Sequence, residues 1–315
     1  MKIITTFLCI LLAIGVFISC QKLLPKPLAE DEILDGPIEG LTPEQLRSFI
    51  KGDVAFNDEV FTAANGLGPL FVANSCASCH AGDGISGRVN WISLPAYAMV
   101  KPGAVVRNGK YIGRFGKKAA VYDLLQQTVN AYNQDMGINS TYEHYNTYNG
   151  QEADAEISNE TVQHVVFYLQ TLKAPIQREQ TNTVVQSGKQ VFLNIGCGKC
   201  HTPQMQTGNF HIPVLANKTF YPYSDFLLHD MGNALNDGYT EGTALPVEWR
   251  TPPLWGLGLS KNSQGGQYFL LHDGRAKSIE EAIIMHGGEA LQSRNAFQQL
   301  NAVDKASILK FLESL

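Results

Sequence analysis

The strongest constraint on this chain is a pentapeptide that occurs twice. Cys-x-x-Cys-His is written as CASCH at residues 76–80 and as CGKCH at residues 197–201. Of the six cysteines, Cys9 and Cys20 lie near the N-terminus, and the other four belong to these two motifs. Four chemistries use a CxxC pair: a zinc knuckle, a redox dithiol, a disulfide and covalent attachment of haem. The compartment, the spacing and the adjoining histidine discriminate between them.

The first twenty residues indicate the compartment. One lysine is followed by an apolar run over residues 3–18 and then by Ser19 and Cys20. This is the shape of a secretory signal, and its end resembles a bacterial lipobox. We therefore expect a signal peptide over 1–19 and a lipid-anchored tether over 20–41, rich in proline and acidic residues. A plain signal peptide or an uncleaved anchor is the alternative, and each interpretation places the protein in the bacterial cell envelope, facing the periplasm or the outside.

Covalent haem explains both motifs better than the other three chemistries. A structural zinc site usually takes its ligands from two knuckles close together in the chain, and zinc gives no reason for a histidine after each second cysteine. A redox dithiol does not need two copies, and a CxxC disulfide closes a small ring with little gain in entropy. In a c-type site the cysteines form thioethers and the histidine binds the iron. We predict two haem c groups, one held by Cys76 and Cys79 with His80 as the iron ligand, the other by Cys197 and Cys200 with His201 as the iron ligand.

The two motifs lie in segments with a similar plan. Each is preceded by an expected helical lead, FNDEVF in the first and SGKQVF in the second, and each segment closes with an amphipathic helix, over 158–175 and 300–315. We expect a mainly α fold of two cytochrome c-like domains, at 42–176 and 180–315, each around one covalently attached haem and with long loops. The polar stretch IQREQTNTVV joins them, and glycines and prolines in the second half indicate loops with short β-hairpins.

Six stretches of the sequence resemble the bacterial di-haem oxidoreductase family, whose members are often labelled thiol oxidoreductase or peroxidase. They are GLGPLFVANSCASCH, GRFGKKAAV, DMGINS, DFLLHDMGNALNDG, RTPPLWGLGL and LHDGRAKSIEEAIIMHGGEA. The resemblance runs from about Phe49 to the C-terminus, its last motif is the most specific, and the family is similar to the di-haem cytochrome c peroxidases and MauG. It implies an oxidoreductase in which one haem reacts with peroxide or another small oxidant while the other relays electrons. The alternative is a lipid-anchored di-haem electron-transfer cytochrome with no open catalytic site.

The resemblance suggests the ligands of the second haem. In the peroxidase group a His-Asp-Gly motif is followed, fourteen residues after its histidine, by the distal ligand, which is Met in the peroxidases and Tyr in MauG. Here the motif begins at His272, and the corresponding residue is His286, with Met285 as the runner-up. His201 and His286 would both bind the iron, and two imidazoles give a lower potential than His and Met. Arg275 would bind a haem propionate.

The first haem has no such obvious partner. In the peroxidase group it can be five-coordinate, with a distal Gln and an acid about ten residues later, and YDLLQQTVNAYNQDMG resembles that segment. Gln127 would orient the oxidant and Asp135 would move a proton. Eight residues on an α-helix turn through ~800°, ~80° past two full turns, so both can face one pocket. The alternatives are that the two residues form a solvated helix face, or that the iron has a distal ligand among Met99, Met136, His144 and His164.

Further expectations concern the surroundings of the haems and the partners. Trp91 is the preferred tryptophan for the gap between the haems, with a core role as the alternative. In relatives a calcium ion sits between the domains on backbone carbonyls, which would be near Gln267 and Phe269. The LLHDMG motif matches the family but suggests no role. The expected partners are a membrane, through the lipid on Cys20, and a small redox protein or quinol-linked electron donor. A net charge of −5 gives no support for a nucleic-acid partner.

Overall fold

The computed structural model describes residues 29–33, 35–68, 86–87, 90–92, 106–107, 109–146, 149–151 and 153–315 of the 315-residue chain. The signal segment, Cys20 and the first Cys-x-x-Cys-His motif lie outside these residues, and for the strands between residues 86 and 107 only the backbone is described. The chain divides into two units. Residues 1–33 contain the 3-10 helix η1 (Glu30–Glu32), and residues 34–315 contain the other described elements. No helix among the described residues is long and apolar enough to cross a membrane.

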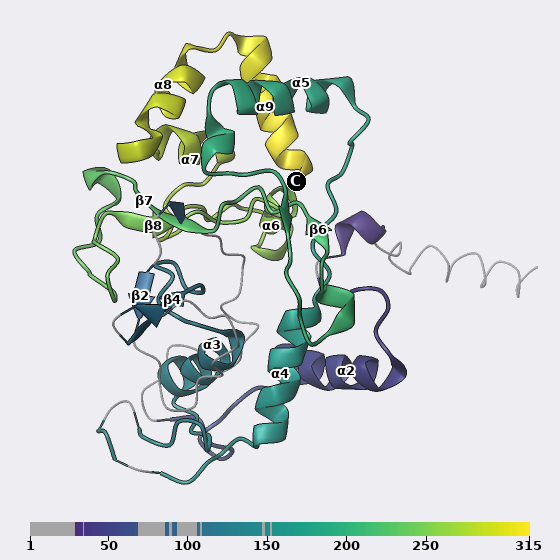
Figure 1. Ribbon diagram of the computed structural model, residues 1–315, viewed down its shortest axis with the longest axis vertical. Coiled ribbons are helices and arrows are strands. Elements are labelled where there is room, and N and C mark those ends of the chain that lie inside the picture. Colours follow the sequence, from purple (N-terminus) through teal and green to yellow (C-terminus); the bar gives the residue numbers. More distant parts are fainter. Residues whose placement is uncertain are drawn as a thin grey trace, which may run out of the picture. The chain divides into compact units, whose positions relative to one another are not determined.

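Residues 34–315 are mainly helical, as the sequence predicts (Figure 1). The α-helices of the described part are α2 (Pro43–Asn57), α3 (Leu124–Asn130), α4 (Asn159–Thr171), α5 (Thr183–Asn194), α6 (Leu257–Ser263), α7 (Ile279–Met285), α8 (Leu291–Gln299) and α9 (Ala302–Ser314). A π-helical turn, η3 (Ala131–Asp135), continues α3. Single 3-10 turns are η4 (Cys197–Lys199), η5 (Pro213–Leu215), η6 (Asn233–Leu235) and η7 (Gly288–Ala290).

The two closing helices begin where the sequence supplies capping side chains. The Ser158 hydroxyl accepts a hydrogen bond from the Thr161 N–H at the start of α4, and the Asn301 side chain accepts one from the Asp304 N–H at the start of α9. Such caps satisfy amide groups that a helix start leaves without partners. Both closing helices are therefore confirmed, the first ending at Thr171.

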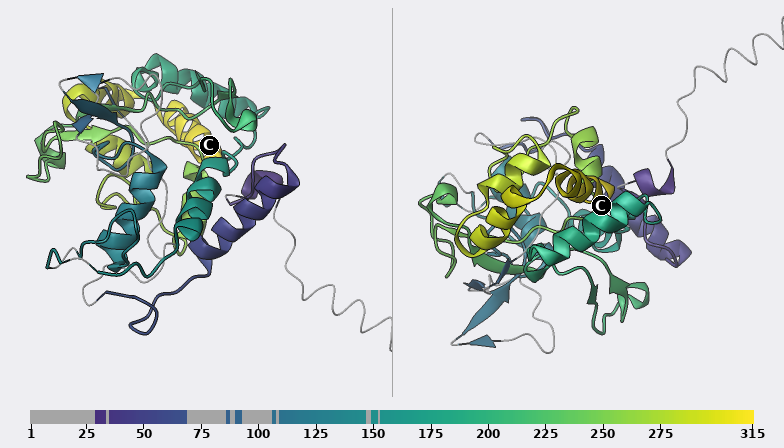
Figure 2. Two further views of the ribbon diagram at one scale, coloured as in Figure 1. Left: turned by 60° about the horizontal axis from the view of Figure 1, so that its bottom comes forward. Right: turned by 90° about the horizontal axis from the view of Figure 1, so that it is seen from above.

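The helix pairs α2 with α4 and α5 with α9 each cross at a glycine. A Cβ atom added to Gly52 of α2 would lie 2.1 Å from the His164 carbonyl oxygen of α4. A Cβ atom added to Gly188 of α5 would lie 1.9 Å from the Ser307 carbonyl oxygen of α9. Only glycine allows backbones to approach this closely. Figure 2 shows α2 beside α4, and α5 beside α9.

Four residues after each glycine, a phenylalanine secures the same crossing. The ring of Phe56 packs against Tyr168 with centroids 5.5 Å apart, and that of Phe192 against Phe311 with centroids 5.3 Å apart. Tyr168 lies four residues after His164, and Phe311 lies four residues after Ser307. In each helix pair, the aromatic contact therefore lies about one helical turn beyond the glycine contact on both helices. The two helix pairs therefore share one Gly-x-x-x-Phe register.

The helical lead expected from FNDEVF before the first motif is wrong. Helix α2 lies earlier in the chain and ends at Asn57, and the residues that follow form turns. The Asn65 side chain accepts hydrogen bonds from the Thr62 N–H and hydroxyl, which offers the backbone an alternative to helix. The equivalent of SGKQVF is KGDVAF, within α2.

Three small sheets connect the loops. Strand β7 (Leu227–Asp230) is central in the first, between β1 (Ser86–Gly87), parallel to it, and β8 (Glu248–Arg250), antiparallel to it. The second sheet has the order β2 (Asn90–Ile92), β4 (Lys110–Gly113), β3 (Val106–Arg107). Strands β5 (Met205–Gln206) and β6 (Thr219–Phe220) form an antiparallel pair. Antiparallel pairs are present in the second half as β5 with β6 and β7 with β8, but their connections, residues 207–218 and 231–247, are longer than those of the short hairpins that the sequence predicts.

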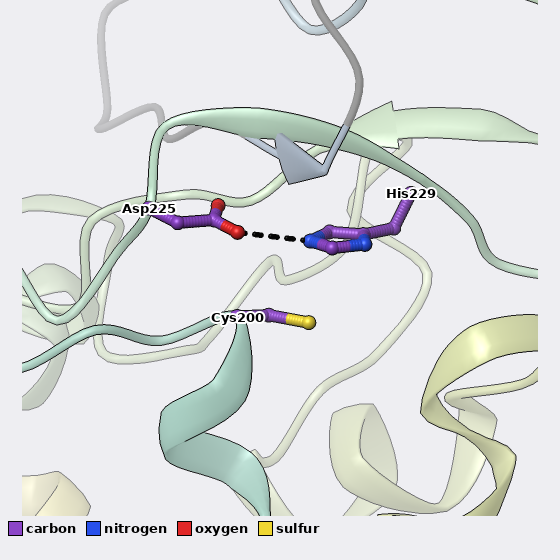
Figure 3. Close-up of side chains that lie close together, drawn as sticks. All are labelled: Cys200, Asp225 and His229. Atoms are coloured by element: carbon purple, nitrogen blue, oxygen red, sulfur yellow. Dashed lines mark hydrogen bonds and ion pairs between the residues drawn. The ribbon is translucent and has the colours of Figure 1, made fainter.

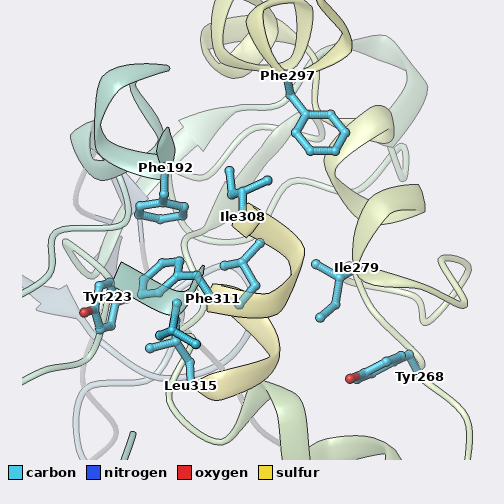
Figure 4. Close-up of a cluster of buried hydrophobic side chains, with 10 residues drawn as sticks. Phe192, Tyr223, Tyr268, Ile279, Phe297, Ile308, Phe311 and Leu315 are labelled. Carbon is cyan, nitrogen blue, oxygen red and sulfur yellow. The ribbon is translucent and has the colours of Figure 1, made fainter. Parts of the chain in front are cut away.

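The described apolar side chains gather into two main clusters. The first, around α3 and α4, consists of Phe61, Leu125, Val129, Tyr132, Met136, Ile138, Ile157, Val162 and Val166. The second surrounds α9 (Figure 4) and consists of Val185, Phe192, Tyr223, Tyr268, Ile279, Phe297, Ile308, Phe311, Leu312 and Leu315. Each cluster draws on residues from only one half of the sequence.

The polar stretch between α4 and α5 packs against the end of α9. The Arg178 N–H donates to the Ser314 carbonyl oxygen at 2.8 Å, and the Gln177 amide donates to the Ser314 hydroxyl at 3.1 Å. Lys310 of α9 pairs with Glu179. This stretch is therefore held in place by α9 and does not behave as a loose linker.

Replacing Gly188 with alanine tests the close crossing of α5 and α9. The added methyl group would force the two backbones apart, and we expect the free energy of unfolding to fall by about 3 kcal/mol. Urea denaturation measures it. The control is Gly208→Ala, because a Cβ atom there has no neighbour within 4 Å. Equal stability of the two variants would contradict the proposed crossing.

Candidate functional site

The second Cys-x-x-Cys-His motif follows α5 after a left-handed glycine. Gly196, with φ 92°, turns the chain from the end of α5 into η4. The His201 N–H donates to the Cys197 carbonyl oxygen at 2.9 Å. This bond keeps Cys197, Cys200 and His201 on one helical turn, the arrangement that suits two thioether bonds and an iron ligand.

The His201 imidazole is held by the main chain of a core residue. Its Nδ1 atom lies 2.9 Å from the carbonyl oxygen of Tyr223, which packs against Phe192 and Phe311 in the second apolar cluster. Nδ1 therefore carries the proton, and Nε2 keeps its lone pair. Burial, together with the nearby His286, lowers the pKa of His201 to about 4. The ring is neutral at pH 7, which is the form that binds a metal.

His286, at the end of α7, is also a buried imidazole whose Nδ1 atom bonds to a main-chain carbonyl group. It follows the last residue of α7, Met285, and therefore caps this helix instead of lying within it. Its Nδ1 atom lies 2.7 Å from the Ala282 carbonyl oxygen, and burial lowers its pKa. The structure thus brings His286 close enough to His201 to affect its pKa, with both rings neutral and both Nδ1 atoms engaged.

The donor set fits haem better than a lone zinc ion. Among the described residues, Cys197, Cys200, His201 and His286 do not bring three ligand atoms within 4.8 Å of one another, as a tetrahedral zinc site requires. Cys197 also packs against the second apolar cluster. Two neutral imidazoles beside two thiols and an apolar surface form the surroundings in which a porphyrin can be held.

A second group of polar side chains lies beside Cys200 (Figure 3). The His229 ring on β7 bonds to two carboxylates, through Nε2 to Asp225 at 3.1 Å and through Nδ1 to Glu289 at 2.6 Å. Burial disfavours the charged ring, but hydrogen bonds to Asp225, Cys200 and Glu289 outweigh it and raise the pKa of His229 to about 11. The ring is therefore an imidazolium. We call Asp225, His229 and Glu289 the carboxylate–histidine bridge.

Sequence reasoning missed this bridge, although LLHDMG and HGGEA were both noted. Ligand atoms of Cys200, Asp225 and His229 lie within 4.8 Å of one another, which is close enough to share a metal ion. His229 is nevertheless a poor ligand, because both of its nitrogens donate to carboxylates and neither keeps a lone pair. No local sequence signal reveals the bridge, because it pairs a histidine of one motif with an acid of another motif sixty residues away.

The His-Asp-Gly motif is built into a stack of side chains. The His272 ring lies on Trp249 with centroids 3.7 Å apart and planes 9° apart. The Lys118 ammonium also lies over Trp249, 3.8 Å from the centroid of the Trp249 ring, and forms an ion pair with Asp237. The stack joins the segment before α3 to β8 and to the loop before α7.

Arg275, the predicted propionate ligand, is engaged by protein groups. Its guanidinium contacts the Asp273 carboxylate at 2.6 Å and donates to the Ala234 carbonyl oxygen at 2.9 Å. These bonds fix the start of the α7 segment against η6. Arg275 keeps further N–H groups, and its contact with a propionate stays a prediction.

The residues predicted for the first haem lie in the other half of the sequence. Gln127 is half-buried on α3, and Asp135 is exposed at the end of the π-helical turn. Such a turn spreads its hydrogen bonds over one more residue than an α-helix, so each residue rotates less and the expected ~80° offset between the two shrinks. Cys76, Cys79 and His80 lie outside the described residues, and of Trp91 only the backbone is described, pairing with Ile112.

The remaining candidates have other surroundings. Met136 is 2% exposed inside the first apolar cluster, and His164 lies 3.2 Å from Glu160 on the same helix. Next to Phe269, a position predicted near calcium, the Lys277 ammonium lies 3.8 Å from the ring centroid. Gln267 is exposed. Met99 lies outside the described residues.

Comparisons with known proteins identify one family and, among the solved structures, distant matches such as the two described here. The model of the family described as "Di-haem oxidoreductase, putative peroxidase" matches residues 81–315. A search of curated proteins finds no match. Hydrazine synthase from Kuenenia stuttgartiensis is 16% identical with a TM-score of 0.45, and the match covers 92% of this chain and 93% of that chain. A MauG-like protein associated with microbial copper homeostasis is 14% identical with a TM-score of 0.46, and the match covers 93% and 95%.

The charge on His229 predicts how stability depends on pH. In the chain before haem attachment, in which Cys200 is a free thiol, the pKa of His229 in the folded protein lies above the ordinary 6.5, so its contribution to stability is complete below pH 6.5 and is lost as the pH rises towards 11. Urea denaturation between pH 7 and 10 should show a falling free energy of unfolding, and His229→Gln should flatten that slope. The exposed His211→Gln is the control. An unchanged slope in His229→Gln would show that the ring is not charged.

Proposed function

Because the chain belongs to the di-haem oxidoreductase family, we propose that it is a peroxidase-like enzyme with one reactive haem and one electron-relay haem. The observation that supports this most strongly is the matched pair His201 and His286. Both rings are neutral, and both leave Nε2 with a lone pair. A pair of this kind suits an iron that is closed to small molecules and exchanges electrons.

The attachment we propose is covalent in both halves. Cys197 and Cys200 would form thioethers to one haem, and Cys76 and Cys79 to the other, with His80 as its proximal ligand. The shared Gly-x-x-x-Phe register of the two helix pairs supports a repeated plan, one haem to each half. The haems supply the redox chemistry, and the chain supplies ligands, orientation and protons.

Gln127 and Asp135 are the residues we propose for the reaction at the first haem. Reduction of hydrogen peroxide to two waters consumes two electrons and two protons. Asp135 is exposed and can take each proton from solvent, whereas the half-buried Gln127 amide can hydrogen-bond the oxidant and orient it. The π-helical turn between them supports this assignment, because such turns are frequent at functional sites.

We further propose that the protein is exported and anchored through a lipid on Cys20. Haem c attachment suits an exported chain, and the N-terminal sequence ends its apolar run at Ser19 and Cys20. The electron donor would be a small redox protein or a quinol-linked protein. A calcium ion near Gln267 and Phe269 also belongs to this proposal.

A second candidate is a di-haem electron carrier without an open site. It is favoured by the closed character of the His201 and His286 pair, if the first haem has a similar pair. The absorption spectrum distinguishes the two functions. A high-spin ferric band that shifts with peroxide or cyanide supports the enzyme, and two low-spin haems without response support the carrier.

Replacing His286 with alanine tests the ligation of the second haem. The iron loses a strong-field ligand, so we expect one low-spin haem to become high-spin in absorption and paramagnetic resonance spectra. Met285→Ala is the control and should keep the low-spin spectrum. Mass spectrometry of natively matured protein must first show two added haems. A spin change in Met285→Ala alone would transfer the role to Met285.

Replacing Asp135 with asparagine tests the proton path. The side chain keeps its size but cannot carry the proton, and we expect peroxide-dependent turnover to fall by about 10²–10⁴-fold. Haem content and both spin states should stay unchanged. The exposed Asp154→Asn serves as the matched control. Equal turnover in the Asp135 variant and the unmodified protein would exclude the role.

A further inference from the structure

The carboxylate–histidine bridge connects two chain segments about sixty residues apart. Both ring nitrogens of His229 donate to carboxylates, so the ring has one fixed orientation. The side chains of His229 and Asp225 are 12% and 14% exposed, and hydrogen bonds between charged groups are stronger than those between neutral groups. Glu289 lies at the outer end, 53% exposed.

One end of the bridge is tied to the segment that carries His201. The Asp225 N–H donates to the Cys200 carbonyl oxygen at 2.7 Å, and the Ser224 N–H to that of Thr202 at 3.0 Å. The neighbouring Tyr223 carbonyl accepts the bond from His201 Nδ1. Residues 223–225 are therefore each hydrogen-bonded to a residue of the segment 200–202, and these bonds hold Asp225 in place relative to His201.

The other end is tied to the segment that carries His286. Glu289 accepts from His229 with one oxygen and from the Asp230 N–H with the other, at 3.0 Å. Just before it, a Cβ atom added to Gly288 would lie 2.1 Å from the Asp230 carbonyl oxygen, and one added to Gly287 would lie 2.7 Å from that of Met231. The backbone directly after His286 therefore packs closely against the end of β7, with no room for a side chain at Gly287 or Gly288.

His286 needs such support because its own helix gives little. Helix α7 has only seven residues, and His286 lies beyond its last turn, where helices fray. A ligand on a mobile segment leaves the iron more often than one on a fixed segment. The bridge and the two glycines supply contacts that α7 lacks.

We propose that the carboxylate–histidine bridge is a positioning device that keeps the His286 segment in register with the His201 segment and so keeps the second haem closed. This inference rests on the proposed function, because it takes both histidines as ligands of one iron. With the bridge intact, His286 would stay in place as the second imidazole ligand and keep small molecules out. With the bridge broken, the His286 side chain would leave that place more readily and admit them.

The test compares His229→Ala and Glu289→Ala in the natively matured protein. Carbon monoxide is mixed with the reduced protein, and the time course of its binding is followed by absorption. A slow phase that is present in the unmodified protein and absent in His286→Ala is the phase limited by departure of His286. We expect this phase to be about tenfold faster in both variants, the effect of losing one hydrogen bond between charged groups. Part of the ferric low-spin signal should become high-spin.

The controls separate positioning from general stability. Glu289→Gln keeps the side-chain size and an acceptor for the Asp230 N–H but turns an amide N–H towards the donor Nδ1 of His229, so it should speed the phase as Glu289→Ala does. The exposed His211→Ala should not change it. If His229→Ala does not fold, Glu289→Ala decides, because Glu289 is half-exposed at the end of the bridge. Unchanged rates and spectra in a folded variant with full haem content overturn the inference alone. Absence of haem at Cys197 and Cys200 in the unmodified protein overturns the proposed function and the inference together.

Discussion

The structure of the second site depends on two hydrogen bonds from imidazole to main chain. His201 donates its Nδ1 proton to the Tyr223 carbonyl oxygen, and His286 donates its own to that of Ala282. Each bond selects the tautomer whose Nε2 atom can bind a metal, and each fixes the plane of the ring. Burial then keeps both rings neutral. Without these bonds, His201 and His286 would be polar residues in an apolar surrounding and not a matched pair of candidate ligands.

The apolar core places those carbonyl groups. Tyr223 is fixed between Phe192 and Phe311, and these two rings belong to the crossing of α5 and α9 that Gly188 permits. The position of His201 thus follows from a glycine and three aromatic rings. In the other half, Gly52 and Phe56 make the corresponding crossing of α2 and α4, which explains why the halves share a plan although their loops differ.

Local sequence signals predicted the parts of the fold that local forces determine. The closing helices follow from apolar spacing and from the caps Ser158 and Asn301, and His286 follows from the resemblance of one motif. The sequence prediction placed the first helical lead at FNDEVF, which ends at Phe61, whereas the helix of the structure contains KGDVAF, which ends at Phe56. Both stretches match SGKQVF, and only the contact of Phe56 with Tyr168 distinguishes them. The bridge through His229 could not be predicted, since pairing residues far apart in sequence depends on strand placement, which periodicity does not encode.

The ligand identity bears on the direction of electron flow. Imidazole is a stronger electron donor to iron than the thioether of methionine, so a haem held by His201 and His286, as we propose, would have a lower reduction potential than one held by His and Met. The carbonyl groups of Tyr223 and Ala282 strengthen the effect, because an imidazole that donates from Nδ1 becomes more basic at Nε2. A haem of low potential gives up electrons readily. The second site is therefore suited to pass electrons on to an oxidising partner, and a reactive first haem would be such a partner.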